Sequence, residues 1–142
     1  MQEIQIHPQL LAGCHDLGRL PACAVLLHRN AVLPWFILVP DTVFNDVLDL
    51  PQEHRHAVIT DCAAVSTFIK EVLGYDKVNF AGLGNVVPQM HLHVIGRSES
   101  DAAWPQPVWG ALQDTATYTA QQLDDIRQGL AKMAGLTVAG SE

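Results

Sequence analysis

Two histidines stand one residue apart inside an apolar run, in the stretch GNVVPQMHLHVIGR at residues 84–97. They are His91 and His93, and Gln89 stands two positions before the first of them. Alternate side chains of a β-strand face the same side, so the three polar residues would share one surface, with roughly 6.6 Å for each two-residue step. Imidazole and amide groups hydrogen-bond to phosphate oxygens, and a neutral imidazole is also a nucleophile. The pattern indicates a surface that binds a phosphate and can react with it.

The turn before this segment favours an anion site. The sequence GLGN at residues 82–85 places Gly84 before Asn85. Glycine lets backbone N–H groups turn toward an anion, as in the concave nests that bind phosphate. The stretch is not a dinucleotide-binding fingerprint, because it lacks the third glycine and leads through Pro88 into a predicted strand. We therefore expect a local phosphate site.

Two other interpretations of the histidines stay open. A histidine on a half-buried strand is often an ordinary residue with satisfied hydrogen bonds. His-x-His is also a common zinc-binding spacing, but a zinc site needs further ligands. His54 and His56 lie at the exposed start of a predicted helix, and no acid shares the face of Gln89 and His93. Nothing obvious completes a metal site, so none is predicted, and a His-ligated metal protein stays as a third and less favoured class of function.

Apolar periodicity predicts the strands that position these residues. Runs at residues 22–28 and 35–39 predict a hairpin, and residues 77–82 and 88–97 predict two more strands joined by the glycine turn. Strands with helices packed against them predict an α+β domain on a mostly antiparallel sheet.

Two helices are predicted to pack on this sheet. The longer spans residues 51–74 and begins with a proline in its first turn, and the second spans residues 118–134 and ends at Gly135. Each carries an apolar stripe at three- and four-residue spacing. The stripes consist of Val58, Cys62, Val65, Ile69 and Val72 in the first helix and Leu123, Ile126, Leu130 and Met133 in the second.

Length, charge and cysteines limit the class of protein. The 142 residues suit a single domain, with a motif-bearing core at about 20–112 and a helical extension at about 113–142. A formal charge of −7 disfavours a nucleic-acid partner. No apolar run reaches the roughly 18 residues of a membrane span, and the N-terminal residues have no basic cluster typical of a secretory signal. Three irregularly spaced cysteines imply no disulfide framework, so we expect a cytoplasmic protein.

At this point the motif resembles that of a known family. QMHLHVI is similar to the signature of the histidine triad (HIT) nucleotide hydrolases and transferases, His-φ-His-φ-His-φ-φ with φ apolar, except that Gln89 stands at the first histidine. LLHRNAVLPWFILVP resembles the family's two nucleoside-binding strands, DLPQEHRHAVITDC its long helix, and KVNFAGLGN its phosphate-side strand and turn. The resemblance covers roughly residues 20–97, and the later AWPQPVWG is similar to a bacterial subset with glutamine in the first position.

The resemblance implies an enzyme that cleaves at the α-phosphorus of a small nucleotide conjugate, such as a dinucleoside polyphosphate or a nucleoside phosphoramidate. His91 would be the nucleophile that forms a covalent nucleotidyl-histidine, and His93 would contact the phosphate. The resemblance also implies a homodimer and no cofactor. Candidate substrate-binding residues are His28 and Asn30 near the ribose, and Asn79, Gly84 and Asn85 near the phosphate.

Gln89 leaves the activity and the leaving group open. A glutamine donates a hydrogen bond but delivers no proton near neutral pH, so amine conjugates should react more slowly than conjugates whose leaving group is a stable anion. The alternative is a nucleotide-binding module with little or no turnover. Trp104 and Trp109 lie in a proline-rich segment that forms either a loop over the core, a dimer contact or a rim beside the phosphate site.

Overall fold

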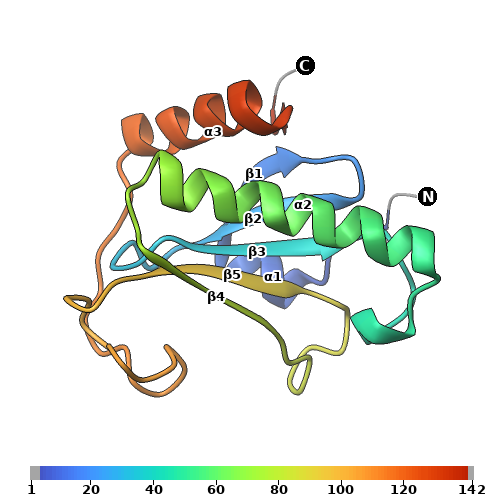
Figure 1. Cartoon of the computed structure of the whole chain (residues 1–142), viewed down its shortest axis with the longest axis horizontal. Helices are drawn as coiled ribbons and strands as arrows, with labels where there is room; N and C mark the ends of the chain where they lie inside the picture. Colours follow the sequence, from blue (N-terminus) through green and yellow to red (C-terminus); the bar gives the residue numbers. More distant parts are fainter. Residues whose placement is uncertain (1–3, 141–142) are drawn as a thin grey trace.

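Six antiparallel strands form the centre of the protein, in a computed structural model that describes residues 4–140 (Figure 1). Their order across the sheet is β4-β5-β3-β2-β1-β6. The strands are β1 (Cys14–Arg19), β2 (Cys23–His28), β3 (Trp35–Pro40), β4 (Lys77–Gly82), β5 (Leu92–Arg97) and β6 (Thr137–Val138). The helices are α1 (Pro8–Ala12), the 3₁₀ turn η1 (Val47–Asp49), α2 (Gln52–Glu71) and α3 (Ala120–Ala134). The predicted α+β architecture, with a long helix on an antiparallel sheet and a C-terminal helix, is confirmed.

The hairpin of β2 and β3 provides the central strands. Leu26 pairs with Ile37 and Leu27 with Phe36, as the two predicted runs required. β5 then pairs with the other edge of β3, which places His93 opposite Ile37. β1 and β6, which were not predicted, extend the sheet beyond β2.

β5 is shorter than predicted. It begins at Leu92, whereas residues 88–91 approach the sheet without strand structure. The pairing explains the difference, because β4 ends at Gly82 opposite Leu92 and the pairing with β3 also stops at Leu92, opposite Leu38. His91 therefore lies just before the strand and His93 inside it.

Helices α2 and α3 lie together on one face of the sheet (Figure 1). The α2 stripe is confirmed from Val58 to Ile69, but Val72 is wrong because the helix ends at Glu71 and this side chain is 54% exposed. In α3, Ile126 and Leu130 are buried, whereas the prediction for Met133 is wrong because its side chain is 43% exposed.

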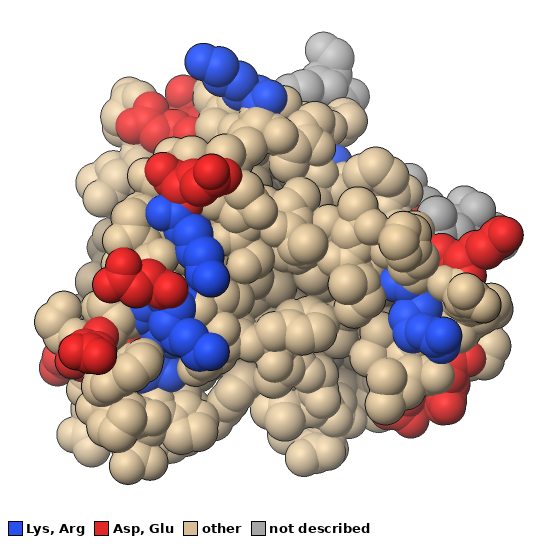
Figure 2. Space-filling view, viewed as in Figure 1, with Lys and Arg blue, Asp and Glu red and all other residues tan. Residues whose placement is uncertain are grey.

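The other face of the sheet carries a second apolar cluster. Leu10 of α1 packs there with Ile37 of β3, Ile95 of β5 and Val87 of the turn. On the face shown in Figure 2, the charged side chains lie along the left and right sides and at the top, with a broad uncharged area between them. Within residues 4–140, no helix is both long and apolar enough to span a membrane.

Candidate active site

His91 has one ring nitrogen fixed and one available. Its Nδ1 lies 2.7 Å from the backbone carbonyl oxygen of Gln89. A carbonyl oxygen only accepts, so Nδ1 carries the proton and the lone pair of a neutral ring is on Nε2. The side chain is 9% exposed, and it borders two cavities. His91 thus presents a nucleophilic nitrogen from an almost fully buried position.

His93 has the opposite tautomer. The indole Nε1–H of Trp35 donates to its Nδ1 at 2.9 Å, so the proton of the neutral ring is on Nε2. Burial, together with the nearby His91 and His28, lowers the pKa of His93 to about 4. The ring is therefore neutral at physiological pH and offers an N–H donor beside His91, whose ring centroid is 5.1 Å away.

His28 provides a second neutral donor. It stacks on Trp35 with ring centroids 4.3 Å apart, and its Nδ1 accepts a hydrogen bond from the backbone N–H of Asn30. Burial lowers the pKa of His28. The neutral ring then carries its proton on Nε2, as in His93.

These three histidines meet the glycine turn at one cavity of about 410 Å³, which we call the histidine cavity. Gly84 and Asn85 form part of its lining together with His28, His91 and His93. Gly84 has a φ of 66°, a conformation that favours glycine. The backbone N–H groups of Gly84 and Asn85 make no hydrogen bond to other described residues, so they can donate to an anion. Gly84 and Asn85, two of the three residues predicted near the phosphate, therefore lie together with the histidines here.

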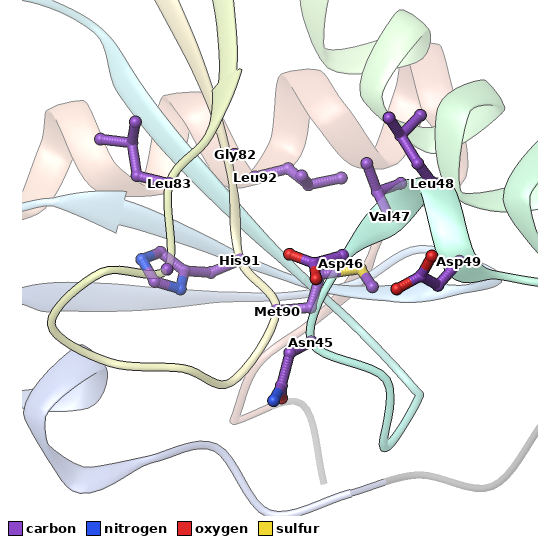
Figure 3. A pocket seen from close by; sticks show the side chains of 11 residues that line it. Asn45, Asp46, Val47, Leu48, Asp49, Gly82, Leu83, Met90, His91 and Leu92 are labelled. Carbon is purple, nitrogen blue, oxygen red and sulfur yellow. The ribbon is translucent and has the colours of Figure 1, made fainter.

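A second cavity of about 360 Å³ also borders His91, and we call it the acidic cavity. Asp46 and Asp49, from the segment around η1, lie across it from the His91 ring (Figure 3). Both carboxylates are on exposed residues, and Gly84 and His91 border both cavities. Among the described residues that line the two cavities there is no lysine or arginine. An anion would therefore be bound by neutral donors.

Three of the predicted site residues have other partners. The Asn30 side chain accepts from the N–H groups of Val32 and Ala116 and donates to the carbonyl of Asp114, so it fastens the turn to a distant segment. Asn79 accepts from Arg97. Both side-chain polar atoms of Gln89 bind the N-terminal backbone. None of these three lines the histidine cavity.

Arg97 fixes the segment that follows β5. Its guanidinium is 1% exposed and binds both carboxylate oxygens of Asp101, the side chain of Asn79 and the carbonyl of Gln106. Burial raises the pKa of Asp101, but hydrogen bonds from Arg97 and from backbone N–H groups outweigh it and hold the value at about 2. Trp104 lies against the same guanidinium, with its ring centroid 5.7 Å away. This ion pair anchors the proline-rich loop.

The anchored loop brings Trp109 to the histidines. Its ring meets His93 edge to face with centroids 4.9 Å apart, and it lines the histidine cavity. Trp35 was missed as a site residue, and for Trp109 the sequence left a rim as one of three alternatives. The position of Trp35 opposite His28 across the hairpin is the signal that could have identified the first.

Side chains in the described part of the chain are not arranged as a metal site. Across residues 4–140, no group of three or more His, Cys, Asp or Glu side chains is arranged to hold a metal ion. His91 and His93 also have Nδ1 atoms already engaged by Gln89 and Trp35.

The comparisons with known proteins place this site in a family. The HIT domain model matches residues 13–100, so the chain belongs to the histidine triad family. It is similar to a histidine triad protein from Marinobacter aquaeolei VT8, with 38% identity, 94% of this chain and 98% of that chain covered, and a TM-score of 0.85. A histidine triad protein from Bradyrhizobium japonicum gives 35% identity, 94% and 99% coverage and a TM-score of 0.85. A third, from Sinorhizobium meliloti 1021, is 28% identical, with 91% of this chain and 96% of that chain covered and a TM-score of 0.84.

A search of curated proteins finds no significant match. Family membership supports a nucleotide hydrolase or transferase in general terms, with a small nucleotide as ligand.

Proposed function

We propose that the protein cleaves small nucleotide conjugates at the α-phosphorus through a nucleotidyl-His91 intermediate. The observation that carries the proposal is the 2.7 Å hydrogen bond from His91 Nδ1 to the Gln89 carbonyl, which leaves the Nε2 lone pair available for attack. His93 and His28 contribute neutral N–H donors, and the backbone N–H groups of Gly84 and Asn85 are further donors. Such preorganised donors stabilise the charge that develops on the phosphoryl oxygens.

In the first step the Nε2 lone pair of His91 forms a bond to phosphorus, while the bond from phosphorus to the leaving atom breaks. The electron pair leaves with that atom. Water then attacks phosphorus and gives up a proton to solvent, the bond between phosphorus and Nε2 breaks with its electron pair returning to Nε2, and nucleoside monophosphate and neutral His91 are released. A phosphate leaving group needs no proton. An amine needs one, and His93 cannot supply it because the ring is neutral near physiological pH.

The two cavities suggest where the two parts of the substrate bind. The histidine cavity contains aromatic and apolar walls, including Ile37 and Trp109, which suit a nucleoside. The acidic cavity also borders His91 and would hold the leaving group. Its carboxylates Asp46 and Asp49 disfavour the binding of a negatively charged leaving group, which opposes the advantage that a phosphate leaving group has in needing no proton.

The experiment is a panel of adenylyl and guanylyl conjugates of both classes, with release of nucleoside monophosphate as the readout. Intact-mass spectrometry after rapid acid-free quenching should show one nucleotidyl adduct. His91→Ala should abolish turnover and the adduct while nucleotide affinity changes little, because other donors bind the phosphate. The exposed His56, on α2, provides the matched control His56→Ala.

Nucleotide binding without turnover or adduct in the unmodified protein would favour the alternative, a binding module. Turnover that survives His91→Ala would remove the covalent mechanism.

We also propose a homodimer. β4 is an edge strand, and Phe80 on it is 50% exposed beside a small apolar groove formed with α2. An exposed edge with apolar side chains favours pairing with a second copy. Sedimentation at micromolar concentration should show twice the chain mass, and a monomer would contradict this.

A further inference from the structure

Gln89 uses its whole side chain on the N-terminal segment. Its Oε1 accepts a hydrogen bond from the backbone N–H of His7 at 2.7 Å, and its Nε2 donates to the carbonyl of Gln5 at 2.8 Å. The two backbone groups stand on either side of Ile6. In an antiparallel sheet, a neighbouring strand would bind the same two groups around a paired residue. The Gln89 side chain therefore takes the place of a one-residue strand beside the N-terminal segment, although Gln89 and His7 are 82 residues apart in the sequence.

The segment held in this way leads directly into a wall of the histidine cavity. His7 caps α1 by accepting the N–H of Gln9 on its Nδ1, and both Gln9 and Leu10 line the cavity. Leu10 also packs with Ile37 and Val87 in the apolar cluster beneath. A helix of five residues has little stability of its own, so α1 depends on such anchors.

The same residue also contacts the nucleophile through its backbone. The carbonyl oxygen of Gln89 accepts a hydrogen bond from His91 Nδ1, while the Gln89 side chain hydrogen-bonds to the backbone of Gln5 and His7. An amide keeps one donor and one acceptor at every pH, whereas an imidazole becomes two donors when protonated. A glutamine at this position thus makes a pH-independent link between the N-terminal segment and the reacting histidine.

We infer that Gln89 is a positioning residue that holds segment 4–12 in place as the wall of the nucleoside site, and that its side chain takes no part in the chemistry at phosphorus. The ligand in this inference rests on the proposed function, but the anchoring of the segment does not. Loss of the anchor should weaken nucleoside binding and leave the chemical step intact.

The test replaces Gln89 by methionine, which keeps the length of the side chain and removes both hydrogen bonds. In the unliganded protein, Gln89→Met should increase hydrogen exchange in residues 4–12, with no change in α2. Affinity for nucleoside monophosphate should fall about tenfold, as expected for two partly exposed hydrogen bonds, while kcat stays within about twofold.

A second pair of variants tests the contact from the other side. His7 has a φ of −54°, which proline adopts readily, so His7→Pro removes the N–H with little backbone change. His7→Ala loses the same imidazole cap but keeps the N–H, and the difference between the two isolates that group. This difference should be about threefold in affinity with Gln89 present and should vanish in the Gln89→Met protein.

Unchanged hydrogen exchange of residues 4–12 in Gln89→Met would overturn the inference. So would a fall in kcat at unchanged affinity, or a Gln89→His variant that gains rate on amine conjugates alone with the segment still protected, since both would place the side chain at the leaving group. If the unmodified protein binds no nucleotide, the proposed function fails, and the exchange measurement still decides the anchoring.

Discussion

The indole nitrogen of Trp35 donates a hydrogen bond to Nδ1 of His93 across 58 positions of sequence, at 2.9 Å. Because an indole N–H can only donate, this contact decides which nitrogen of His93 carries the proton. The reactive side of the site therefore receives an N–H group, and the neighbouring His91 supplies the lone pair.

Trp35→Phe should lower kcat/KM roughly tenfold, equivalent to about 1.4 kcal/mol, because the His93 tautomer is no longer fixed. A phenylalanine ring retains the stacking on His28, so nucleotide affinity should change less than kcat. Steady-state kinetics measure the effect, and nitrogen NMR of the His93 ring reports the tautomer. Unchanged kinetics in a variant with mixed tautomers would show that the Trp35 contact is structural only.

Stability should fall as the pH is lowered from about 6.5 to about 4. The pKa of His93 is lowered from 6.5 to about 4 in the folded protein, so within this window the unfolded chain takes up a proton that the folded one does not. The free energy of unfolding should drop by about 3 kcal/mol from this residue, and His28, whose pKa is also lowered, acts in the same direction. Urea unfolding across the window measures the slope. His93→Gln should make it shallower, whereas His56→Gln should not.

The acidic cavity should discriminate between leaving groups by charge. Asp46→Asn combined with Asp49→Asn should raise kcat/KM for a dinucleoside polyphosphate roughly threefold, the size expected for exposed charges, and leave a phosphoramidate with a neutral amine unchanged. Asp124→Asn on α3, also exposed, is the matched control. Equal gains for both substrates would mean that the leaving group does not enter this cavity.

Asn79 and Asn85 should give opposite results. Asn79→Ala leaves a nitrogen of the buried Arg97 without its partner, so the free energy of unfolding should fall by about 1–3 kcal/mol with KM unchanged. Asn85→Ala alters the lining of the histidine cavity, so KM should rise with little change in stability. Chemical denaturation and kinetics of the two variants test this. A rise in KM for Asn79→Ala would indicate that Asn79 contacts the substrate after all.

Local patterns were enough to predict which residues of the segment 84–93 meet at the histidine cavity. His91, His93 and Gly84 lie within ten positions, so strand alternation and glycine conformation place them without knowledge of the rest of the chain. His28 was named only through the family resemblance, and it lines the same cavity. In each case the side chain points where its own strand or turn directs it.

Long-range partners explain what the sequence could not predict. Asn30 and Asn79 have the right chemistry for substrate binding, but one is engaged by Ala116 and the other by Arg97. Gln89 is likewise engaged by the N-terminal segment, which has no apolar periodicity and forms only the short α1. Such pairings depend on tertiary contacts between distant segments, and nothing in the local pattern distinguishes an engaged amide from an available one.

The lining of the two cavities has a consequence for how a nucleotide reaches the site. The protein carries a formal charge of −7, and no lysine or arginine lines either described cavity. An approaching nucleotide is therefore repelled at long range and held only after contact, by neutral donors. Added salt screens that repulsion, so the rate of encounter should increase with ionic strength, opposite to the behaviour of sites that attract phosphates with a basic surface. In the proposed reaction, the same absence of counter-charge favours fast release of the monophosphate product into solution.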